Sequence, residues 1–169
     1  VFAAGVDEEP LLAYWVNGTR TVLESGSNRT LTGIYVSGGN VYISGYSTSP
    51  QRAFYYKNNT KYNLETSIDS SARDIVVVGD DVYVAGYYTI GSDNFACYWR
   101  NGVRVDMTHP IVEGNDTFAR AIAIKDGDIY MAGNFSNDMI PINTACFWKN
   151  GTLYSLNEDN TYATSLFVY

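Results

Sequence analysis

The sequence contains one unit repeated four times, about every 43 residues, and this repeat constrains the fold more than any other feature. A five-residue segment ending in glycine occurs in each unit: Val1–Gly5, Val41–Gly45, Val82–Gly86 and Ile129–Gly133. An aromatic pair and an Asn turn follow it: Tyr14-Trp15 with Asn17, Tyr55-Tyr56 with Asn58, Tyr98-Trp99 with Asn101, and Phe147-Trp148 with Asn150. An alternating apolar segment precedes the next glycine and is anchored at Ile34, Ile75, Ile122 and Leu166.

Each unit predicts four short strands, which we call a (anchor strand), b (Gly-ending strand), c (aromatic strand) and d (the strand after the Asn turn). Asn-Gly between c and d is a strong hairpin signal, and no segment has the apolar spacing of a helix. Four strands per repeat predict an all-β, four-bladed β-propeller of four-stranded antiparallel blades. We expect a single domain over residues 1–169, with blades at 161–169 plus 1–29, 30–70, 71–116 and 117–160.

The chain starts at strand b and stops just after strand a, which predicts how the ring closes. Strand a of the first blade, Ala163–Tyr169, is expected beside Val1–Gly5, so that one blade contains both termini. Relative to the other units, about three residues are missing from this connection. Closure would remove the open sheet edges that an array of strands otherwise exposes.

One unit resembles bacterial propeller repeats of the SBBP type. Ala72–Val77 followed by Asp81–Tyr87 is similar to the Ala-x-x-Ile-x-Val … Gly-Asn-Val-Tyr-Val-x-Gly-Tyr core of that family, and the other units are similar more weakly. The resemblance implies the propeller fold. It brings no catalytic motif and no cofactor.

Composition excludes two classes of partner. Eighteen acidic and eleven basic side chains give a net charge of −7, which disfavours binding to a nucleic acid backbone. The longest aliphatic run, Ile75–Val78, is too short to span a bilayer.

The aromatic strand is apolar on both faces, since Trp99 shares one face with Cys97 and Tyr98 lies on the other. This pattern predicts packing between two neighbouring blades, and a sugar-binding role is the alternative. Equivalent positions of adjacent blades lie too far apart for a disulfide, so Cys97 and Cys146 are expected to be free and buried. For ligand contacts, the candidates are the tyrosines that follow strand b: Tyr46, Tyr87 and Tyr88.

Asn-x-Ser/Thr sequons are more than twice as frequent as random order of this composition predicts. The six predicted glycosylation sites are Asn17, Asn28, Asn58, Asn115, Asn134 and Asn150, all expected at exposed turns or strand ends. Turn chemistry alone explains Asn17, Asn58 and Asn150, because Asn is favoured in these hairpins. It does not explain the other three, so the excess favours an extracellular or cell-surface glycoprotein.

Catalytic and metal sites find little support in the sequence. Acidic turns at Asp7-Glu8-Glu9, Asp80-Asp81 and Asp126/Asp128 are candidate calcium ligands, but Asp is simply favoured in turns and no spaced ligand series is present. His109 is the single histidine. We therefore predict no catalytic residues, no metal and no cofactor.

The resulting expectation is a non-catalytic, extracellular structural or adhesion module that associates with itself or with another extracellular protein or glycan. Self-assembly into a filament is one version, in which the C-terminal strand completes a neighbouring subunit's open blade. A lectin-like carbohydrate-binding module is the alternative. A glycoside-processing enzyme, with paired carboxylates from different blades, is a lesser one.

Overall fold

The computed structural model describes residues 1–6, 11–26, 28–108, 115–137 and 140–169, and within these ranges it contains fifteen β-strands and no helix. The strands form four antiparallel sheets, each made of consecutive strands. The first sheet has three strands: β1 (Phe2–Val6), β2 (Leu11–Val16) and β3 (Thr19–Ser25). The second has four: β4 (Arg29–Ser37), β5 (Asn40–Thr48), β6 (Gln51–Lys57) and β7 (Thr60–Asn63). The third contains β8 (Ser70–Val78), β9 (Asp81–Ile90), β10 (Asp93–Arg100) and β11 (Val103–Asp106). The fourth contains β12 (Asn115–Lys125), β13 (Asp128–Asn137), β14 (Ile140–Lys149) and β15 (Thr152–Asp159).

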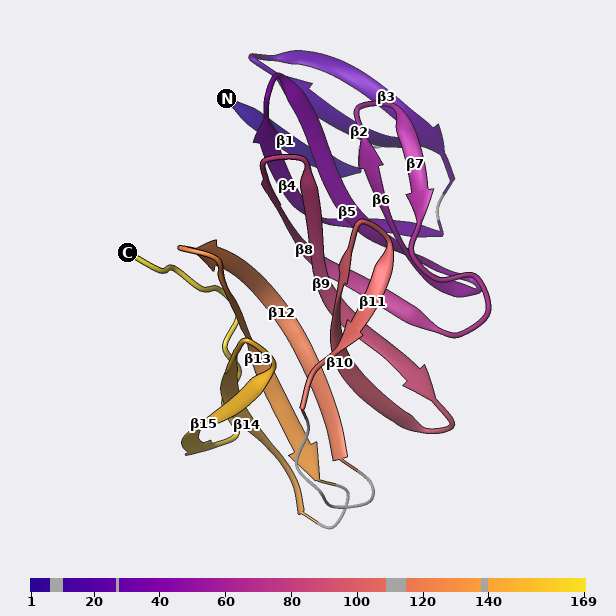
Figure 1. Ribbon diagram of the computed structural model, residues 1–169. Helices are drawn as coiled ribbons and strands as arrows, with labels where there is room; N and C mark the ends of the chain where they lie inside the picture. The colour runs from indigo at the N-terminus through magenta and orange to yellow at the C-terminus, as the bar shows by residue number, and fades with distance from the viewer. Residues whose placement is uncertain (7–10, 27, 109–114, 138–139) are drawn as a thin grey trace.

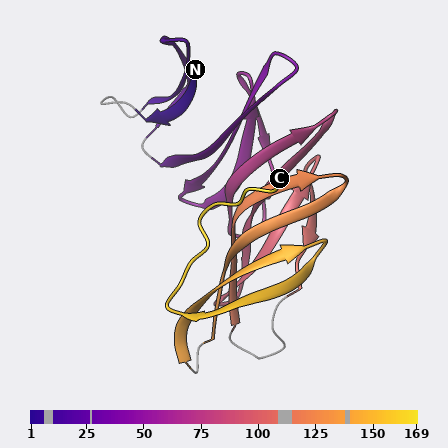
Figure 2. The same cartoon turned by 90° about the vertical axis from the view of Figure 1, so that its left-hand side faces the viewer.

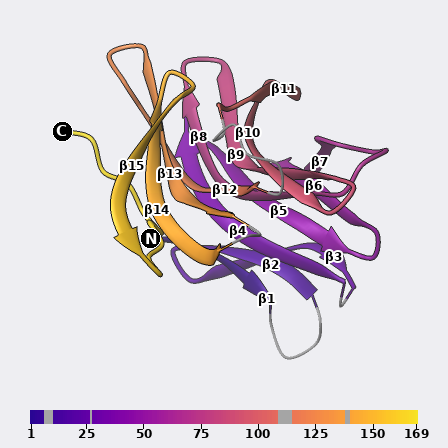
Figure 3. The same cartoon turned by 90° about the horizontal axis from the view of Figure 1, so that it is seen from below.

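The sheets follow one another in chain order (Figure 1). Among their first strands, β8 contacts both β4 and β12. Seen from below, these three strands lie on the inner side while the fourth strands lie outside (Figure 3). The repeat therefore predicts the strands and their order within three complete sheets correctly.

Asparagine closes each hairpin between the third and fourth strand of a unit. Asn17, Asn58, Asn101 and Asn150 all have positive φ angles between 49° and 53°, a conformation that Asn tolerates better than most residues. Each side chain also accepts a hydrogen bond, through Oδ1, from the first amine or amide of the unit's Gly-ending strand: Val1, Val41, Val82 and Ile129, respectively.

A β-bulge interrupts the first strand of each four-stranded sheet at the same repeat position. The register shifts between Leu31 and Gly33, between Ala72 and Asp74, and between Ala119 and Ala121. The extra residues are Thr32, Arg73 and Arg120. A bulge changes the direction of the side chain of its extra residue. These three side chains therefore do not follow the regular alternation of side chains between the two faces of the sheet.

Apolar side chains fill the space between neighbouring sheets. Between the second and third sheets, Ala53 and Tyr55 pack with Cys97, Trp99 and Ile75. The next two interfaces use the same repeat positions, namely Ala96 with Cys146, Trp148 and Ile122, and Leu12 and Tyr14 with Phe54 and Tyr56. Packing of both faces of the aromatic strand between sheets is thus confirmed for β6 and β10, whereas β2 and β14, at the ends of the series, pack against a neighbouring sheet on one face.

The predicted closing strand is not formed. Ala163–Tyr169 contains no strand, and within the described residues β1 pairs only with β2. In space, the C-terminal segment runs along the fourth sheet, whereas β1 lies away from this segment (Figure 2). In each complete sheet, the first and second strands form a hairpin joined by a short turn. Ala163–Tyr169 and β1 have no such turn between them, because they belong to opposite ends of the series of sheets. The structure is therefore an open series of repeated antiparallel sheets.

In each complete sheet, a glycine of the second strand lies directly against the backbone of the first strand. A Cβ atom at Gly86 would overlap the carbonyl oxygen of Ser71, and one at Gly133 would overlap that of Phe118. At the equivalent Gly5 there is no such strand, and the nearest atom to a Cβ would be Trp15 Cζ3 at 3.9 Å.

We predict that Gly86→Ala lowers the free energy of unfolding by about 2–3 kcal/mol, because the strands must separate to admit the methyl group. With no inner strand opposite Gly5 in the described part of the chain, Gly5→Ala should stay within about 0.5 kcal/mol of wild type. Urea unfolding followed by circular dichroism measures both. An equally large loss for Gly5→Ala would contradict this open arrangement and would indicate an inner strand opposite Gly5.

Glu24, on β3, links the first sheet to the second. Its Oε1 lies 2.8 Å from Arg29 Nε and 3.1 Å from Lys61 Nζ, and it accepts a short hydrogen bond from the Tyr56 hydroxyl. Burial by itself would raise the pKa of this carboxyl, but the hydrogen bonds from Tyr56 and Lys61 and the charge of Arg29 outweigh it, so the pKa lies below its usual value.

We predict that Glu24→Gln destabilises the protein by about 1–2 kcal/mol at neutral pH. Because the folded-state pKa is lowered, the contribution of Glu24 is present above its unfolded pKa of about 4.5 and is lost as pH falls through the lower folded value. Thermal unfolding at a series of pH values should show the wild type and the variant converging in acid. A constant difference down to pH 2 would contradict the assignment.

Candidate functional site

Two arginines from neighbouring sheets converge at the bulges of β8 and β12. Arg73 donates a hydrogen bond from Nη2 to the hydroxyl of Tyr87 at 3.2 Å. Its guanidinium carbon lies 4.9 Å from the ring centre of Tyr46 and 5.4 Å from that of Tyr87. This contact with two aromatic rings fixes the head group between the second and third sheets.

Arg120 occupies the same repeat position one sheet further on. It donates from Nε to Asn134 Oδ1 at 2.9 Å, and its guanidinium carbon lies 5.3 Å from the ring centre of Tyr162. Burial lowers the pKa of Arg120 from its usual value, and the positive charge of Arg73 lowers it further. The two cations are therefore close enough to repel each other.

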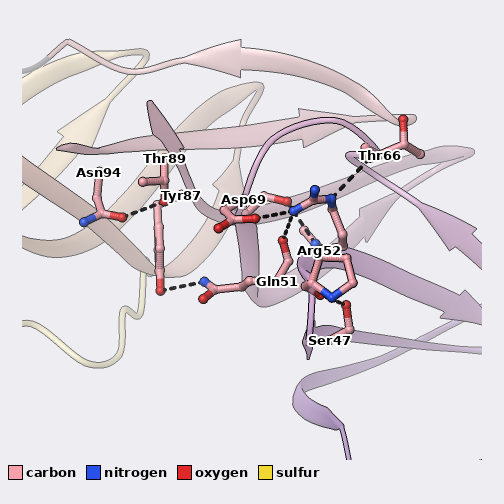
Figure 4. Close-up of polar contacts among 11 residues, drawn as sticks. Ser47, Gln51, Arg52, Thr66, Asp69, Tyr87, Thr89 and Asn94 are labelled. Atoms are coloured by element: carbon pink, nitrogen blue, oxygen red, sulfur yellow. Dashed lines mark hydrogen bonds and ion pairs between the residues drawn. The ribbon is translucent and has the colours of Figure 1, made fainter. Parts of the chain in front are cut away.

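The Tyr87 hydroxyl connects Arg73 to the second sheet. Gln51 Nε2 donates to this oxygen at 3.3 Å, and Figure 4 shows the Gln51 amide pointing at it. The Tyr87 ring also meets Phe118 edge to face at 4.9 Å. We call Tyr46, Gln51, Arg73, Tyr87, Arg120, Asn134 and Tyr162 the arginine–tyrosine cluster.

Most basic side chains outside this cluster are paired with acids. Arg52 forms an ion pair with Asp69 and donates to the Thr66 carbonyl at 3.2 Å (Figure 4). Similar pairs link Arg29 and Lys61 to Glu24, Arg100 to Asp81, Arg104 to Glu65 and Asp106, Lys125 to Asp126, and Lys149 to Asp128. Within the described residues, Arg73 and Arg120 form no ion pair with a carboxylate.

The carboxylate of Asp74, next to Arg73 in sequence, is hydrogen-bonded to backbone amides. Its two carboxylate oxygens accept hydrogen bonds from the amides of Ile75 at 2.8 Å and Ile122 at 3.0 Å. Burial raises the pKa of Asp74 above its usual value despite these two bonds. The side chain thus links β8 to β12.

Of the tyrosines predicted as ligand contacts, Tyr46 and Tyr87 come together in the cluster and Tyr88 does not. Tyr88 is 6% exposed, stacks on Phe95 with ring centres 5.4 Å apart, and is covered by Arg104 at 3.9 Å. It follows Tyr87 on a strand, so it faces the opposite side of the sheet. The prediction for Tyr88 is wrong for this reason.

The sequence prediction missed Arg73 and Arg120. The sequence feature that marks both is an arginine two positions before the anchor residue, present in two of the four units.

The structure gives the turn sequons a folding role. Asn58 and Asn150 donate through Nδ2, the atom that would carry a glycan, to Asn40 and Asp128. Asn101 does the same toward Asp81 although it is not part of a sequon. The repeated Asn is therefore explained by the turn, and glycosylation at Asn17, Asn58 and Asn150 stays a prediction.

Asn134 does not lie at the exposed position expected of it. It is fully buried, and it uses Oδ1 for Arg120 and Nδ2 for Asn143 at 2.8 Å. A glycan does not fit there in the folded protein. Asn28 is exposed, and the side chain of Asn115 lies outside the described residues.

The two cysteines, Cys97 and Cys146, are free and buried, as predicted. Burial raises the pKa of the Cys146 thiol to about 12 and that of Cys97 well above its usual value.

Acidic turn residues hold the hairpins together. Asp81 and Asp128 bind Arg100 with Asn101 and Lys149 with Asn150, respectively. The described part of the chain holds no group of three or more His, Cys, Asp or Glu side chains able to bind a metal ion. His109 and the Asp7-Glu8-Glu9 turn lie outside the described residues.

No known protein-family model matches the chain, and comparison with curated proteins gives no match. The resemblance to SBBP-type repeats stays a prediction from the sequence. In the described residues, no helix is long and apolar enough to cross a membrane.

Proposed function

We propose that the chain is a non-catalytic, extracellular structural or adhesion module that works as a four-bladed β-propeller, its first blade completed by the strand Ala163–Tyr169. The same strand can complete a second copy and so assemble copies head to tail. One observation carries the proposal: the C-terminal segment is attached to the fourth sheet as the first strand of a further sheet would be.

That attachment is a hydrogen bond that a backbone amide donates to a side-chain hydroxyl. Ser70, at the start of β8, accepts one from the Ala53 amide at 3.0 Å, and Thr117 of β12 accepts one from Ala96 at 2.8 Å. Both hydroxyls lie five residues before the anchor. Thr161, five residues before Leu166, accepts the same bond from Ala145 at 3.0 Å.

The first sheet offers a matching vacancy. A hollow of about 180 Å³ lies between Ala4 and the β4 residues Leu31–Ile34. Leu31 and Ile34 are only partly buried, whereas the equivalent Ala72 and Ile75 of β8 are 0% and 2% exposed. Within the described residues, β8 has an inner strand on each side, β4 and β12, whereas β4 has such a neighbour, β8, on one side only.

The complete sheets give the register of the missing pair. Gly86 pairs with Ala72, Val84 with Ile75 and Val82 with Val77. The same offsets set Gly5 opposite Ala163, Ala3 opposite Leu166 and Val1 opposite Val168. Phe2 and Phe167 then face each other, and both are exposed in the open structure, at 43% and 83%.

We predict that Phe2→Cys combined with Phe167→Cys forms a disulfide on mild oxidation, because directly opposed residues of an antiparallel pair lie within bridging distance. Non-reducing electrophoresis separates a fast-migrating closed monomer, which indicates the propeller, from covalent oligomers, which indicate head-to-tail assembly. Cys97 and Cys146 should not compete, because both thiols are buried.

The matched control is Phe2→Cys with Tyr162→Cys, because Tyr162 is exposed but belongs at the other end of the same pair of strands. Equal cross-linking of both variants, or of neither, would refute the proposed strand pairing.

The extracellular and non-catalytic parts of the proposal rest on the sequence. Asn28 remains an exposed sequon that the hairpin turns do not explain. Intact mass of native material reports any attached glycan, and an unmodified mass from a glycosylating host would count against a glycoprotein.

A carbohydrate-binding module is the second candidate, and one observation favours it: Tyr46 and Tyr87 from different sheets lie together around Arg73. Tyr and Arg are frequent anchors of binding surfaces. We expect Tyr87→Ala to abolish binding on a glycan array, and an array on which the wild type binds nothing would remove this candidate.

A further inference from the structure

We propose that Arg73, Arg120 and the Tyr87 hydroxyl form a binding site for the carboxylate of an acidic sugar. The inference deepens the carbohydrate-binding candidate, since it names the class of saccharide. It does not depend on closure of the ring.

The hydrogen bonds of Tyr87 give the first argument. A phenol oxygen has one proton to donate and lone pairs to accept with. The Tyr87 oxygen already receives bonds from Arg73 at 3.2 Å and Gln51 at 3.3 Å. Its own proton is therefore left to donate to a third group, and no acceptor for it is found among the described residues.

The charge of the cluster gives the second argument. The protein carries a net charge of −7, and its basic side chains are mostly paired with acids. Arg73 and Arg120 nevertheless lie at the neighbouring bulges of β8 and β12, which are joined by the bond from the Ile122 amide to Asp74 and by the contact of Tyr87 with Phe118. Neither arginine has a carboxylate partner in the described part of the chain, although burial and mutual repulsion oppose this arrangement. A bound anion would relieve that repulsion.

The N–H donors of the two arginines favour a carboxylate over other anions. A guanidinium presents planar pairs of N–H groups that match a carboxylate, and Arg uses this geometry more effectively than Lys. Arg73 uses Nη2 for Tyr87, and Arg120 uses Nε for Asn134. The remaining N–H groups of both side chains are available for a ligand oxygen.

The surroundings select the rest of the ligand. Tyr46 and Tyr162 flank the two guanidinium groups, and Tyr162 is 51% exposed. Aromatic rings beside a polar centre suit the apolar C–H face of a sugar ring. A polyanion is disfavoured by the overall negative charge, so a sugar bearing single carboxylates fits best.

Titration calorimetry with 3′-sialyllactose and galacturonic acid tests the site, with the methyl esters of both as neutral counterparts. We expect at least one acid to bind about tenfold or more tightly than its neutral counterpart. Arg73→Gln and Arg120→Gln should each weaken that binding about tenfold. Tyr87→Phe, which removes only the hydroxyl, should weaken it several-fold.

The matched control is Lys125→Gln, because Lys125 lies at the C-terminal end of the strand that carries Arg120, away from the bulge, and the charge change is identical. It should bind like the wild type. Thermal unfolding of each variant shows whether it is folded, and Arg120→Lys, which keeps the charge, should recover part of the affinity if Arg120→Gln is folded but inactive.

The outcomes separate the two proposals. Equal binding of acid and neutral sugars, or unchanged binding in both Arg→Gln variants, overturns the carboxylate site and leaves a carbohydrate-binding module. Inorganic phosphate binding as tightly as the sugar acids shows a general anion site and overturns the proposed class. Binding of no saccharide overturns both.

Discussion

The structure depends on the fact that each repeated sheet is apolar on both faces. In the third sheet, Trp99 and Cys97 pack toward the second sheet, while Tyr83 and Ala96 pack toward the fourth. A sheet of this kind cannot expose either face to water without losing the hydrophobic contribution of that face. Sheets must therefore stack in series, and the series must be covered or closed at its two ends.

The inner strands show how strongly burial depends on neighbours. β8, with β4 on one side and β12 on the other, contains the best buried anchor residue, Ile75. β4 has the same pattern but only one such neighbour, and its Ile34 is partly exposed. These two strands occupy the same repeat position, and the difference in burial between their anchor residues follows the number of inner strands beside them.

Much of this architecture follows from the sequence because local patterns determine it. The Asn turns, the Gly-ending strands and the aromatic strands were predictable from spacing, since each is specified within a few residues. The bulges were not, because the shift at Arg73 depends on close contact between β8 and its neighbours. That shift decides which tyrosines meet an arginine, so Tyr87 but not Tyr88 belongs to the site.

Long-range features escaped prediction for the same reason. Asn134 looked like an exposed sequon, and only the position of Arg120 and Asn143 in space makes it a buried hydrogen-bonding residue. Closure of the ring was expected from the count of strands, yet the structure leaves β1 without that partner. Pairing of segments at opposite ends of a chain has no turn to favour it and carries the full entropy cost of bringing them together.

A hydroxyl at one repeat position, present in three of the four units, has a consequence for how such a protein can change in evolution. Ser70, Thr117 and Thr161 make the same bond to the preceding sheet, so the junctions that they form are chemically interchangeable. Duplication or loss of one unit would then create no new kind of interface, and the number of sheets can vary while every contact between them is kept. In such a lineage, unit number would be limited by the geometry of closing the series rather than by the stability of any single junction.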